Sequence, residues 1–542
     1  MLIPAFLAIL FVISTVEGVT VKISTGALAG YQHIPYAAPP IGDLRFEKPR
    51  PPKNWTGLRD ATEYGPACIS NSSTTKSPQK WVDEDCLHVN IFAGEDCLKN
   101  SCPVVFYIHG GGFNYDSAVM FKDKFLVNNF GGNDVVLVVP GFRLGFFGLL
   151  TFASDEVVPR NIGAYDLLAA LKFVKDEIKN FGGNPDDVTL FGHSGGAAAA
   201  AQFAFSKRID PDKKLFQKAC LPSRTPNYNS TAFTEGVVRC LRDVDSMEIL
   251  RIQREMEDEG EHRKPEGLVM TAPLFAAQDL QGFFHKPPSR SIVTGTTSEE
   301  LDTSDDPLGE SIAQLLGIKN LEEVLKRYYE DLASNKLPFN HSASTQQIFL
   351  SSYVIGHAQR EAGGKVYLYS YSNPRHPAHT DDLSYIMGVH EFEHDANEAV
   401  LAVLYPKFFV DFVKTGKPRR DWAPLQAVLD NYMDINVDVD NGTMPHMALH
   451  YESEVVSYWK GLIDYDRQIT ALKKAVVETR AMDVSGVADT GATSDDSSTV
   501  IELFLPLFAV VITVVIVGLL VRRREMRKQS FKDRSEKMPL FS

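Results

Sequence analysis

The chain has 542 residues, of which 44% are hydrophobic and 23% charged, and its formal net charge is -14. This composition is typical of a globular protein and excludes wholesale disorder, which goes with few apolar residues. The acidic balance also gives no support to nucleic-acid binding, which depends on basic surfaces.

The N-terminus has the features of a secretory signal. An apolar run from Leu2 to Val12 ends in small and polar residues, which predicts a signal peptide over residues 1–18. Six cysteines indicate disulfides in a secreted chain, and Cys97 and Cys102, which stand before a strand, are expected to pair locally. Five N-x-S/T sequons are candidate glycosylation sites: Asn54, Asn71, Asn229, Asn340 and Asn441.

A glycine-rich loop follows a buried strand. Val104–Ile108 is continuously apolar, and His109-Gly110-Gly111-Gly112-Phe113 comes directly after it. Consecutive glycines let backbone N–H groups face a reacting carbonyl oxygen. We therefore expect Gly111 and Gly112 to contribute to an oxyanion hole, the usual role of an H-G-G-G loop upstream of a nucleophilic serine.

That serine stands in a second glycine-rich turn. The strand Val188–Phe191 runs into Gly192-His193-Ser194-Gly195-Gly196, and an alanine-rich helix is predicted over Gly195–Phe205. This is the strand–turn–helix context of the G-x-S-x-G nucleophile elbow, which presents the serine hydroxyl to a base. The N–H of Gly195, at the helix N-terminus, is expected to point toward a developing oxyanion.

Strands and helices alternate around these two loops. Further strands are predicted over Val135–Val139 and Lys218–Leu221, and a helix over Tyr165–Lys179. Apolar strands that alternate with helices predict a mainly parallel sheet covered on both faces, with its site at the carboxyl ends of the strands. Cys220 lies in the strand 218–221 and Cys240 on a following helix, and their pairing stays open.

The C-terminal part of the sequence predicts a membrane anchor. Residues 503–521 are uncharged and long enough to span a bilayer, and Arg522, Arg523 and Arg524 follow at once. We expect a flexible stalk over 476–502, a span over 503–521 and a basic cytoplasmic tail over 522–542. With the signal peptide, this predicts a single-pass type I protein of the cell membrane, with its large domain, about residues 19–475, outside.

Several motifs together carry a resemblance to one family. Residues 34–46 (IPYAAPPIGDLRF), the segment Glu84-Asp85-Cys86-Leu87-His88-Val89-Asn90 and the blocks beginning at Arg143, Asn161 and Phe181 are similar to those of type-B carboxylesterases, which include the cholinesterases. The resemblance implies an α/β-hydrolase fold, serine hydrolysis of a small carboxylic ester, no cofactor, and a Cys68–Cys86 disulfide. One departure is at the elbow, because the family most often has Glu-Ser-Ala where this chain has His193-Ser194-Gly195.

The same resemblance supplies the catalytic acid and base. The family's acid segment matches Gly295-Thr296-Thr297-Ser298-Glu299-Glu300, which makes Glu300 the acid, with Glu299 and Asp302 as rivals and Leu301 in place of a glycine. The family's histidine motif H-G-x-E-L matches His379-Thr380-Asp381-Asp382-Leu383, which makes His379 the base and His376 the alternative. The order Ser194, Glu300, His379 is that of the α/β-hydrolases.

A competing motif lies just downstream. His390-Glu391-Phe392-Glu393-His394 matches the zinc motif H-E-x-x-H, but no suitably spaced third ligand follows, so we expect no metal site.

The alternative to an enzyme is a binding or adhesion protein. Some relatives with a signal, an esterase-like ectodomain and one span are inactive cell-surface binding or adhesion proteins, which would act through an extracellular protein ligand or a homodimer. Because this chain keeps all three catalytic residues, an ester hydrolase is favoured.

Overall fold

The computed structural model describes residues 14–23, 26–54, 57–71, 79, 81–151, 155–156, 158–222, 241–258, 273–275, 280–302 and 309–486. The chain divides into two compact units, Met1–Thr470 and Ala471–Ser542, and the fold below is that of the first. Several predictions lie outside the described residues: the first 13 residues of the signal peptide, Asn229, Cys240, the span 503–521 and the tail 522–542. Residues 14–18 of the predicted signal begin strand β1, and the first part of the predicted stalk continues helix α14 as far as Gly486.

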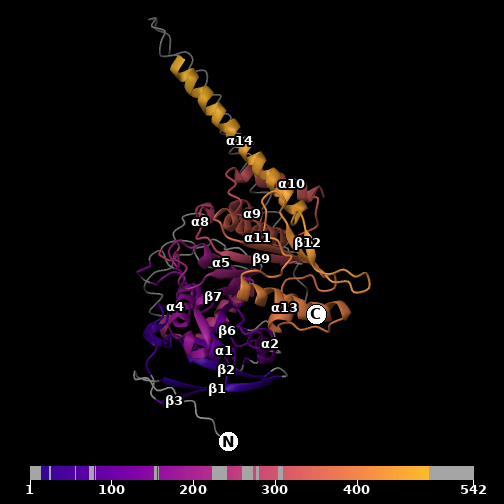
Figure 1. Cartoon of the computed structure of the whole chain (residues 1–542). Helices are drawn as coiled ribbons and strands as arrows, with labels where there is room; N and C mark the ends of the chain where they lie inside the picture. The colour runs from indigo at the N-terminus through magenta and orange to yellow at the C-terminus, as the bar shows by residue number, and fades with distance from the viewer. Residues whose placement is uncertain are drawn as a thin grey trace, which may run out of the picture. The chain divides into compact units, whose positions relative to one another are not determined.

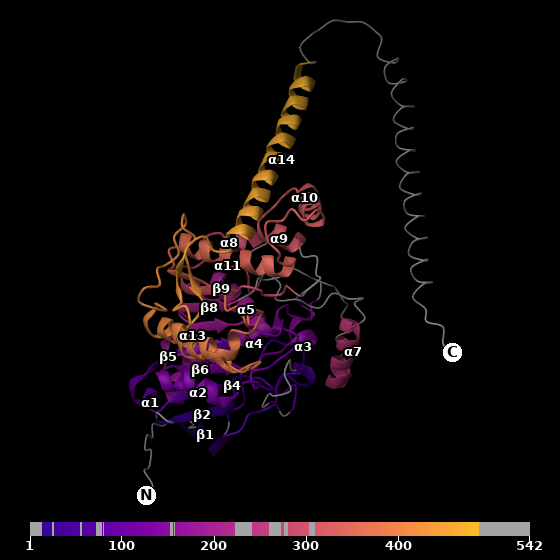
Figure 2. The same ribbon diagram turned by 90° about the vertical axis from the view of Figure 1, so that its right-hand side faces the viewer.

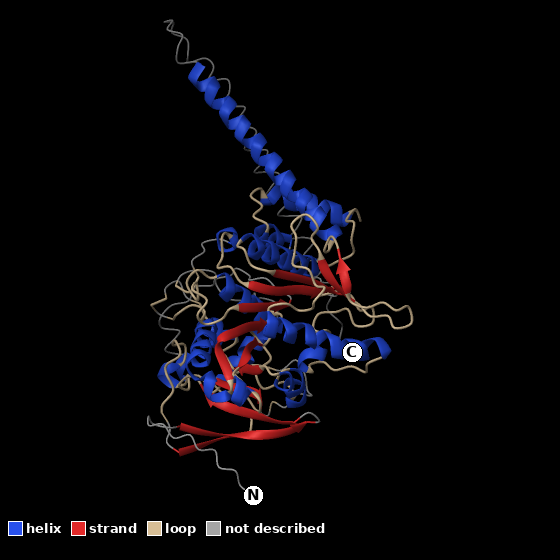
Figure 3. Cartoon of the chain, in the orientation of Figure 1, coloured by secondary structure: helices blue, strands red, loops and turns tan. Residues whose placement is uncertain are grey.

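The described strands form one twelve-stranded sheet (Figures 1 and 3). Their spatial order is β12-β11-β10-β9-β8-β7-β5-β6-β4-β2-β1-β3. The strands in chain order are β1 (Ser14–Ile23), β2 (Gly26–Pro35), β3 (Gly57–Ala61), β4 (His88–Gly94), β5 (Cys102–Ile108), β6 (Val136–Pro140), β7 (Gly183–Gly192), β8 (Lys218–Pro222), β9 (Ser291–Thr297), β10 (Val366–Tyr371), β11 (Tyr432–Ile435) and β12 (His446–Ala448).

The central part of the sheet is parallel, as predicted. Every neighbouring pair from β11 to β6 is parallel, whereas β12 and the strands β4, β2 and β1 pair antiparallel with their inner neighbours. Parallel strands need crossover connections, and the intervening segments supply helices. This is the α/β-hydrolase architecture expected from the resemblance.

The helices are α1 (Cys97–Asn100), α2 (Asp123–Asn129), α3 (Gly145–Leu149), α4 (Ile162–Glu177), α5 (Gly195–Phe205), α7 (Ser246–Asp258), α8 (Leu280–Phe284), α9 (Gly309–Leu315), α10 (Leu321–Ala333), α11 (Ala343–Glu361), α12 (Leu383–Met387), α13 (Ala396–Thr415) and α14 (Ser453–Gly486). Short 3₁₀ turns occur at Gly42–Leu44, Gly131–Asn133 and Ile178–Phe181. No helix within these described segments is both long and apolar enough to cross a membrane.

Two hydrophobic cores cover the two faces of the sheet, because successive side chains of a strand point to opposite sides. Val104, Phe106 and Ile108 of β5 pack with α4, α5 and α11 in one core, whereas Val105 and Tyr107 pack with α2, α12 and α13 in the other (Figures 1 and 2). The continuous apolar runs of the sequence therefore correspond to strands buried on both faces.

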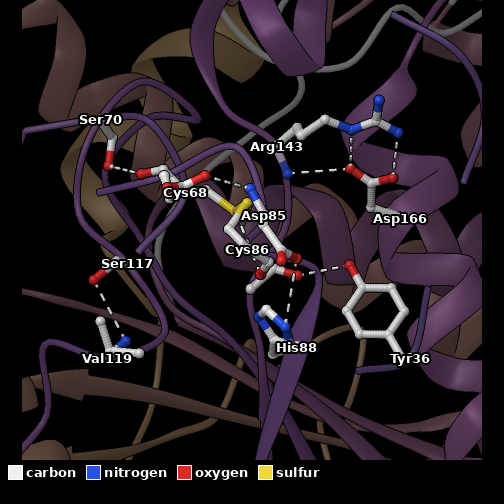
Figure 4. The surroundings of a disulfide bond; sticks show 12 residues. Tyr36, Cys68, Ser70, Asp85, Cys86, His88, Ser117, Val119, Arg143 and Asp166 are labelled. Atoms are coloured by element: carbon white, nitrogen blue, oxygen red, sulfur yellow. Dashed lines mark hydrogen bonds and ion pairs between the residues drawn. A yellow bond between two sulfur atoms is a disulfide. The ribbon is translucent and has the colours of Figure 1, made fainter. Parts of the chain in front are cut away.

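Residues of the signature motifs in the N-terminal half are buried and bonded to one another. Cys68 and Cys86 form a disulfide, and Arg143 donates two side-chain hydrogen bonds to the buried carboxylate of Asp166, at 2.6 and 2.8 Å (Figure 4). A second disulfide joins Cys97 to Cys102. Both expected bridges are thus present. Cys220 is buried in β8, and burial raises the pKa of its thiol.

Candidate active site

The predicted elbow joins β7 to α5. Ser194 has φ 53° and ψ -122°, a strained conformation for a residue with a side chain, and it is 7% exposed. The start of α5 also lies close to the end of β5, since a Cβ on Gly196 would lie 2.0 Å from the carbonyl oxygen of Ile108. Glycine is required there, and the sharp turn directs the Ser194 hydroxyl to the carboxyl end of the sheet.

The structure brings the three predicted catalytic side chains together. The Nε2 atom of His379 lies 3.0 Å from the Oγ atom of Ser194, and its Nδ1 atom lies 2.5 Å from Oε2 of Glu300. The other carboxylate oxygen of Glu300 accepts a hydrogen bond from the Thr297 N–H at 2.9 Å. A serine, an imidazole and a buried carboxylate in this order have the geometry of a nucleophile, a general base and its orienting acid.

The loops that carry the acid and the base are joined to each other by the backbone. Glu299 pairs with Ala378 as a parallel bridge, and the N–H of Glu299 donates to the carbonyl of Pro377 at 3.0 Å. The N–H of His379 then donates to the carbonyl of Glu300 at 2.9 Å. These bonds hold the loops of Glu300 and His379 together, although 79 positions separate the two residues in the sequence.

The residues considered as alternatives to Glu300 and His379 have other partners or lie on the surface. Glu299 is exposed, and Asp302 binds Nδ1 of His341 at 2.8 Å. His376, the alternative base, bonds through Nδ1 to Glu398, a fully buried carboxylate that also pairs with Arg375. His376 and Glu398 therefore form a second histidine–glutamate pair, separate from the one that contacts Ser194.

The glycine-rich loop after β5 faces the elbow. Gly111 has φ 90°, and a Cβ there would lie 2.0 Å from the carbonyl oxygen of Tyr115, so only glycine fits. Its own carbonyl accepts the N–H groups of Asn114 and Tyr115 at 2.9 and 3.1 Å, which turns the N–H of Gly112 to the opposite side of the planar peptide. A Cβ on Gly195 would lie 3.0 Å from that nitrogen, so the backbones of Gly112 and Gly195 are adjacent.

Two buried titratable groups next to the triad were not assigned a role from the sequence. Asp382 is buried and accepts a hydrogen bond from the Tyr405 hydroxyl at 2.6 Å, and burial raises the pKa of its carboxyl to about 6. His193, beside the nucleophile, has its ring centre 5.3 Å from that of His379. Burial, together with the nearby His379 and His390, lowers the pKa of His193 well below its usual value, so its imidazole is neutral at physiological pH.

The zinc motif lies in a loop and lacks the helix that would place two histidines one turn apart. The segment between α12 and α13 is irregular, His390 has φ 55°, and Glu391 pairs with Lys122. Within the described ranges, no group of three or more His, Cys, Asp or Glu side chains is arranged to hold a metal ion.

At two positions this chain has another residue where the family has glycine, and the backbone conformation differs between the two. Thr380 has φ 78°, in the left-handed region that β-branched residues avoid. Leu301 is not among the residues with positive φ, and its N–H donates to the hydroxyl of Thr345 at 2.8 Å. The turn after Glu300 therefore does not need a glycine, whereas the turn after His379 does favour one.

Comparison with known proteins identifies the family. A sequence model of the carboxylesterase family matches residues 9–346 and 317–459. The chain belongs to the carboxylesterase family. Like the family, it is a carboxylic ester hydrolase built on the α/β-hydrolase fold.

Individual relatives agree with this assignment. The chain is 29% identical to carboxylesterase 5A of Mus musculus over 491 residues, which cover 76% of this chain and 82% of that protein. It is 28% identical to esterase cest-33 of Caenorhabditis elegans over 460 residues, 72% of this chain and 81% of that protein. A shorter stretch of 224 residues, 39% of this chain and 36% of the relative, is 35% identical to acetylcholinesterase of Bungarus fasciatus.

Proposed function

We propose that this carboxylesterase acts through Ser194, Glu300 and His379 by way of an acyl-enzyme intermediate. The observation that carries the proposal is the continuous chain of contacts from the Ser194 hydroxyl through both ring nitrogens of His379 to Glu300. A serine hydroxyl becomes an effective nucleophile only when a base within hydrogen-bond distance can take its proton.

The reaction then follows from the positions of these atoms. His379 Nε2 takes the proton from Ser194 as its Oγ attacks the ester carbonyl, and the oxyanion receives hydrogen bonds from the N–H groups of Gly111, Gly112 and Gly195. His379 returns the proton to the leaving alcohol as the C–O bond breaks. Water then attacks the acyl carbon and gives a proton to the same nitrogen. The acid leaves as the bond to Ser194 breaks, and His379 returns the proton to the Ser194 oxygen. Glu300 stabilises the charged imidazole in both halves of the reaction.

The test uses the whole chain and its Ser194→Ala variant, each assayed with a short-chain aryl ester and a fluorophosphonate probe. We expect the wild-type protein to label and to turn over, and the variant to do neither, with no effect of a chelator. Activity that a chelator abolishes would contradict the serine mechanism. A folded wild-type protein that neither labels nor turns over would favour the adhesion or binding function in place of catalysis.

We further propose that the protein is a glycoprotein anchored in the cell membrane by residues 503–521, with the catalytic domain outside. Four sequon asparagines, Asn54, Asn71, Asn340 and Asn441, are exposed in the structure, which supports glycan attachment at the surface. The test is expression of the full chain in mammalian cells. A mass decrease after N-glycosidase treatment and retention in the membrane pellet at alkaline pH are expected, and a soluble, unglycosylated product would contradict the proposal.

A further inference from the structure

The glycine-rich loop after β5 has a backbone that other parts of the chain must hold in place. Three consecutive residues, Gly111, Gly112 and Phe113, have positive φ angles of 90°, 57° and 66°. Glycine adopts this region readily, but a residue with a bulky side chain such as Phe113 rarely does. Such a conformation persists only where the surrounding contacts fix it. The contacts made by the carbonyl groups of this loop therefore decide the direction of its N–H groups.

Asn114 is bonded to the carbonyl groups of both peptides that Gly112 joins. Its main-chain N–H donates to the Gly111 carbonyl at 2.9 Å, and its side-chain Nδ2 donates to the Gly112 carbonyl at 3.1 Å. Because a peptide is planar, a fixed carbonyl also fixes the N–H on the other side of the same bond. The first bond therefore sets the direction of the Gly112 N–H, and the second prevents rotation of the next peptide.

Asn114 and the end of the loop are themselves held by two helices. Asn114 is 6% exposed, and its main-chain carbonyl accepts a hydrogen bond from Nη2 of Arg254 in α7 at 3.1 Å. The carbonyl of Phe113 accepts the N–H of Gly145, at the start of α3, at 2.8 Å. The loop is thus preorganised by contacts that do not involve a substrate, which is the condition for effective stabilisation of an oxyanion.

The direction of the Gly112 N–H matters because the loop lies against the nucleophile. A Cβ on Gly195 would lie 3.0 Å from the Gly112 nitrogen, and a Cβ on Gly110 would lie 3.2 Å from Cβ of Ser194. Glycine has no side chain to restrain its own backbone. A displacement of about 1 Å in a catalytic group can lower a rate by about 10²-fold, so the restraint has to come from a neighbour.

We propose that Asn114 is a positioning residue for the oxyanion hole, because its side-chain amide holds the Gly112 peptide so that the Gly112 N–H points at the carbonyl oxygen of the bound ester. The inference rests on the proposed serine mechanism and adds the residue that prepares one of its donors. Asn114 acts through Gly112, and it exchanges no proton with the substrate.

The first test is Asn114→Ala in the full chain, which removes the amide and keeps the main-chain bond to Gly111. We expect kcat and kcat/KM for a short-chain aryl ester to fall together by about 10–100-fold, because the oxyanion exists only in the transition state. Asn114→Asp has the same shape, and it should lose at least as much activity, since a carboxylate cannot donate to the Gly112 carbonyl.

A trifluoromethyl alkyl ketone gives a readout that is specific to the oxyanion hole. The Ser194 Oγ adds to the ketone carbon, its proton passes to His379 Nε2, and the ketone oxygen becomes an oxyanion with no leaving group to expel. This adduct resembles the transition state, so its inhibition constant should rise in Asn114→Ala by the same factor as kcat/KM falls. The corresponding methyl ketone, which does not accumulate such an adduct, should bind equally well to both proteins.

Two further measurements distinguish positioning from a general loss of structure. The acid limb of the pH profile of kcat/KM reports the protonation of His379, so it should not move in Asn114→Ala. The matched control is Asn431, which is also buried and whose Nδ2 donates to the carbonyls of Ala423 and Pro424, at 3.3 and 3.2 Å, in the loop before β11. Asn431→Ala should lower stability and leave kcat unchanged.

The possible results separate this inference from the mechanism on which it depends. An unchanged kcat/KM in Asn114→Ala, a fall that the ketone affinity does not follow, or an equal fall in Asn431→Ala would overturn the role of Asn114 while leaving the esterase intact. If Asn114→Ala does not fold, Asn114→Asp decides by the same ketone comparison. A folded wild-type protein that neither hydrolyses the ester nor labels with a fluorophosphonate would instead remove the proposed function itself.

Discussion

His379 and Glu300 are joined twice, through their side chains and through their backbones. The imidazole Nδ1 lies 2.5 Å from the carboxylate, and the main-chain N–H of His379 donates to the main-chain carbonyl of Glu300 at 2.9 Å. Glu300 is thereby fixed in position independently of its side-chain contact with His379. Removal of its charge should change catalysis without displacing the loop.

Glu300→Gln is therefore expected to lower kcat by about 10⁴-fold, the effect known for an amide in place of the acid of a serine triad, because the base loses its correct tautomer and its counter-charge. The measurement is steady-state hydrolysis of an aryl ester, with circular dichroism to verify the fold. Glu299→Gln is the matched control, since Glu299 is adjacent, exposed and on the same loop. Equal losses in both variants would contradict the assignment of the acid.

Thr380 and Leu301 both stand where the family has glycine, but substitution by glycine should change stability in opposite directions at the two positions. Thr380 has φ 78°, so Thr380→Gly should relieve strain and raise the free energy of unfolding by about 1 kcal/mol, even after the greater entropy of glycine in the unfolded chain is subtracted. Leu301 lacks a positive φ, so Leu301→Gly should lower the free energy of unfolding by about 1–2 kcal/mol. Urea unfolding of both variants is the measurement, and destabilisation by Thr380→Gly would show that its threonine is not strained.

The two disulfides should differ in what they contribute to stability. Cys68–Cys86 closes a loop with a sequence separation of 18 and Cys97–Cys102 one of 5. In the chain-entropy model the larger loop stabilises the fold by about 3 kcal/mol and the smaller by about 2 kcal/mol. Paired Cys→Ala variants, compared by thermal unfolding without reductant, should rank in this order. The opposite ranking would mean that local packing, and not loop closure, dominates.

The glycine-bounded turns and the parallel sheet could be predicted because each depends on local sequence. The pattern around Ser194 contains its own strand and helix, and the apolar runs show which strands are buried on both faces. The resemblance to the family supplied Glu300 and His379, which no local pattern distinguishes from Glu299 or His376.

The features that could not be predicted from the sequence are contacts between segments that are far apart in the chain. The Thr297 N–H that holds Glu300, the bridge between Glu299 and Ala378, and the Tyr405 hydroxyl on Asp382 each require the folded chain. The residues that match the zinc motif have no helical conformation, which the pattern H-E-x-x-H alone does not reveal. His193 did carry a signal, its departure from the family's glutamate, but only the structure shows that its ring lies against the base.

Asp382 allows a prediction about pH and stability. Its carboxyl is buried, and burial raises its pKa from the usual value of 3.8 to about 6, so between these pH values the folded protein binds more protons than the unfolded chain. The stability that this group contributes is therefore present below about pH 4 and is lost as the pH rises toward 6 and above. At pH 8 the folded protein holds a charged carboxylate that the interior disfavours.

Asp382→Asn removes that charge and keeps an oxygen to accept the Tyr405 hydroxyl. The variant should be more stable than the wild type at pH 8, by up to about 3 kcal/mol, which is a shift of about two pKa units converted to free energy. The advantage should shrink as the pH falls from 8 to 5. Urea unfolding at several pH values measures it, and Tyr405→Phe should have the opposite sign, because it removes the donor that stabilises the charged carboxylate. An Asp382→Asn variant that is less stable than the wild type at pH 8, or whose effect is the same at every pH, would mean that this carboxyl titrates near its ordinary value in the folded protein.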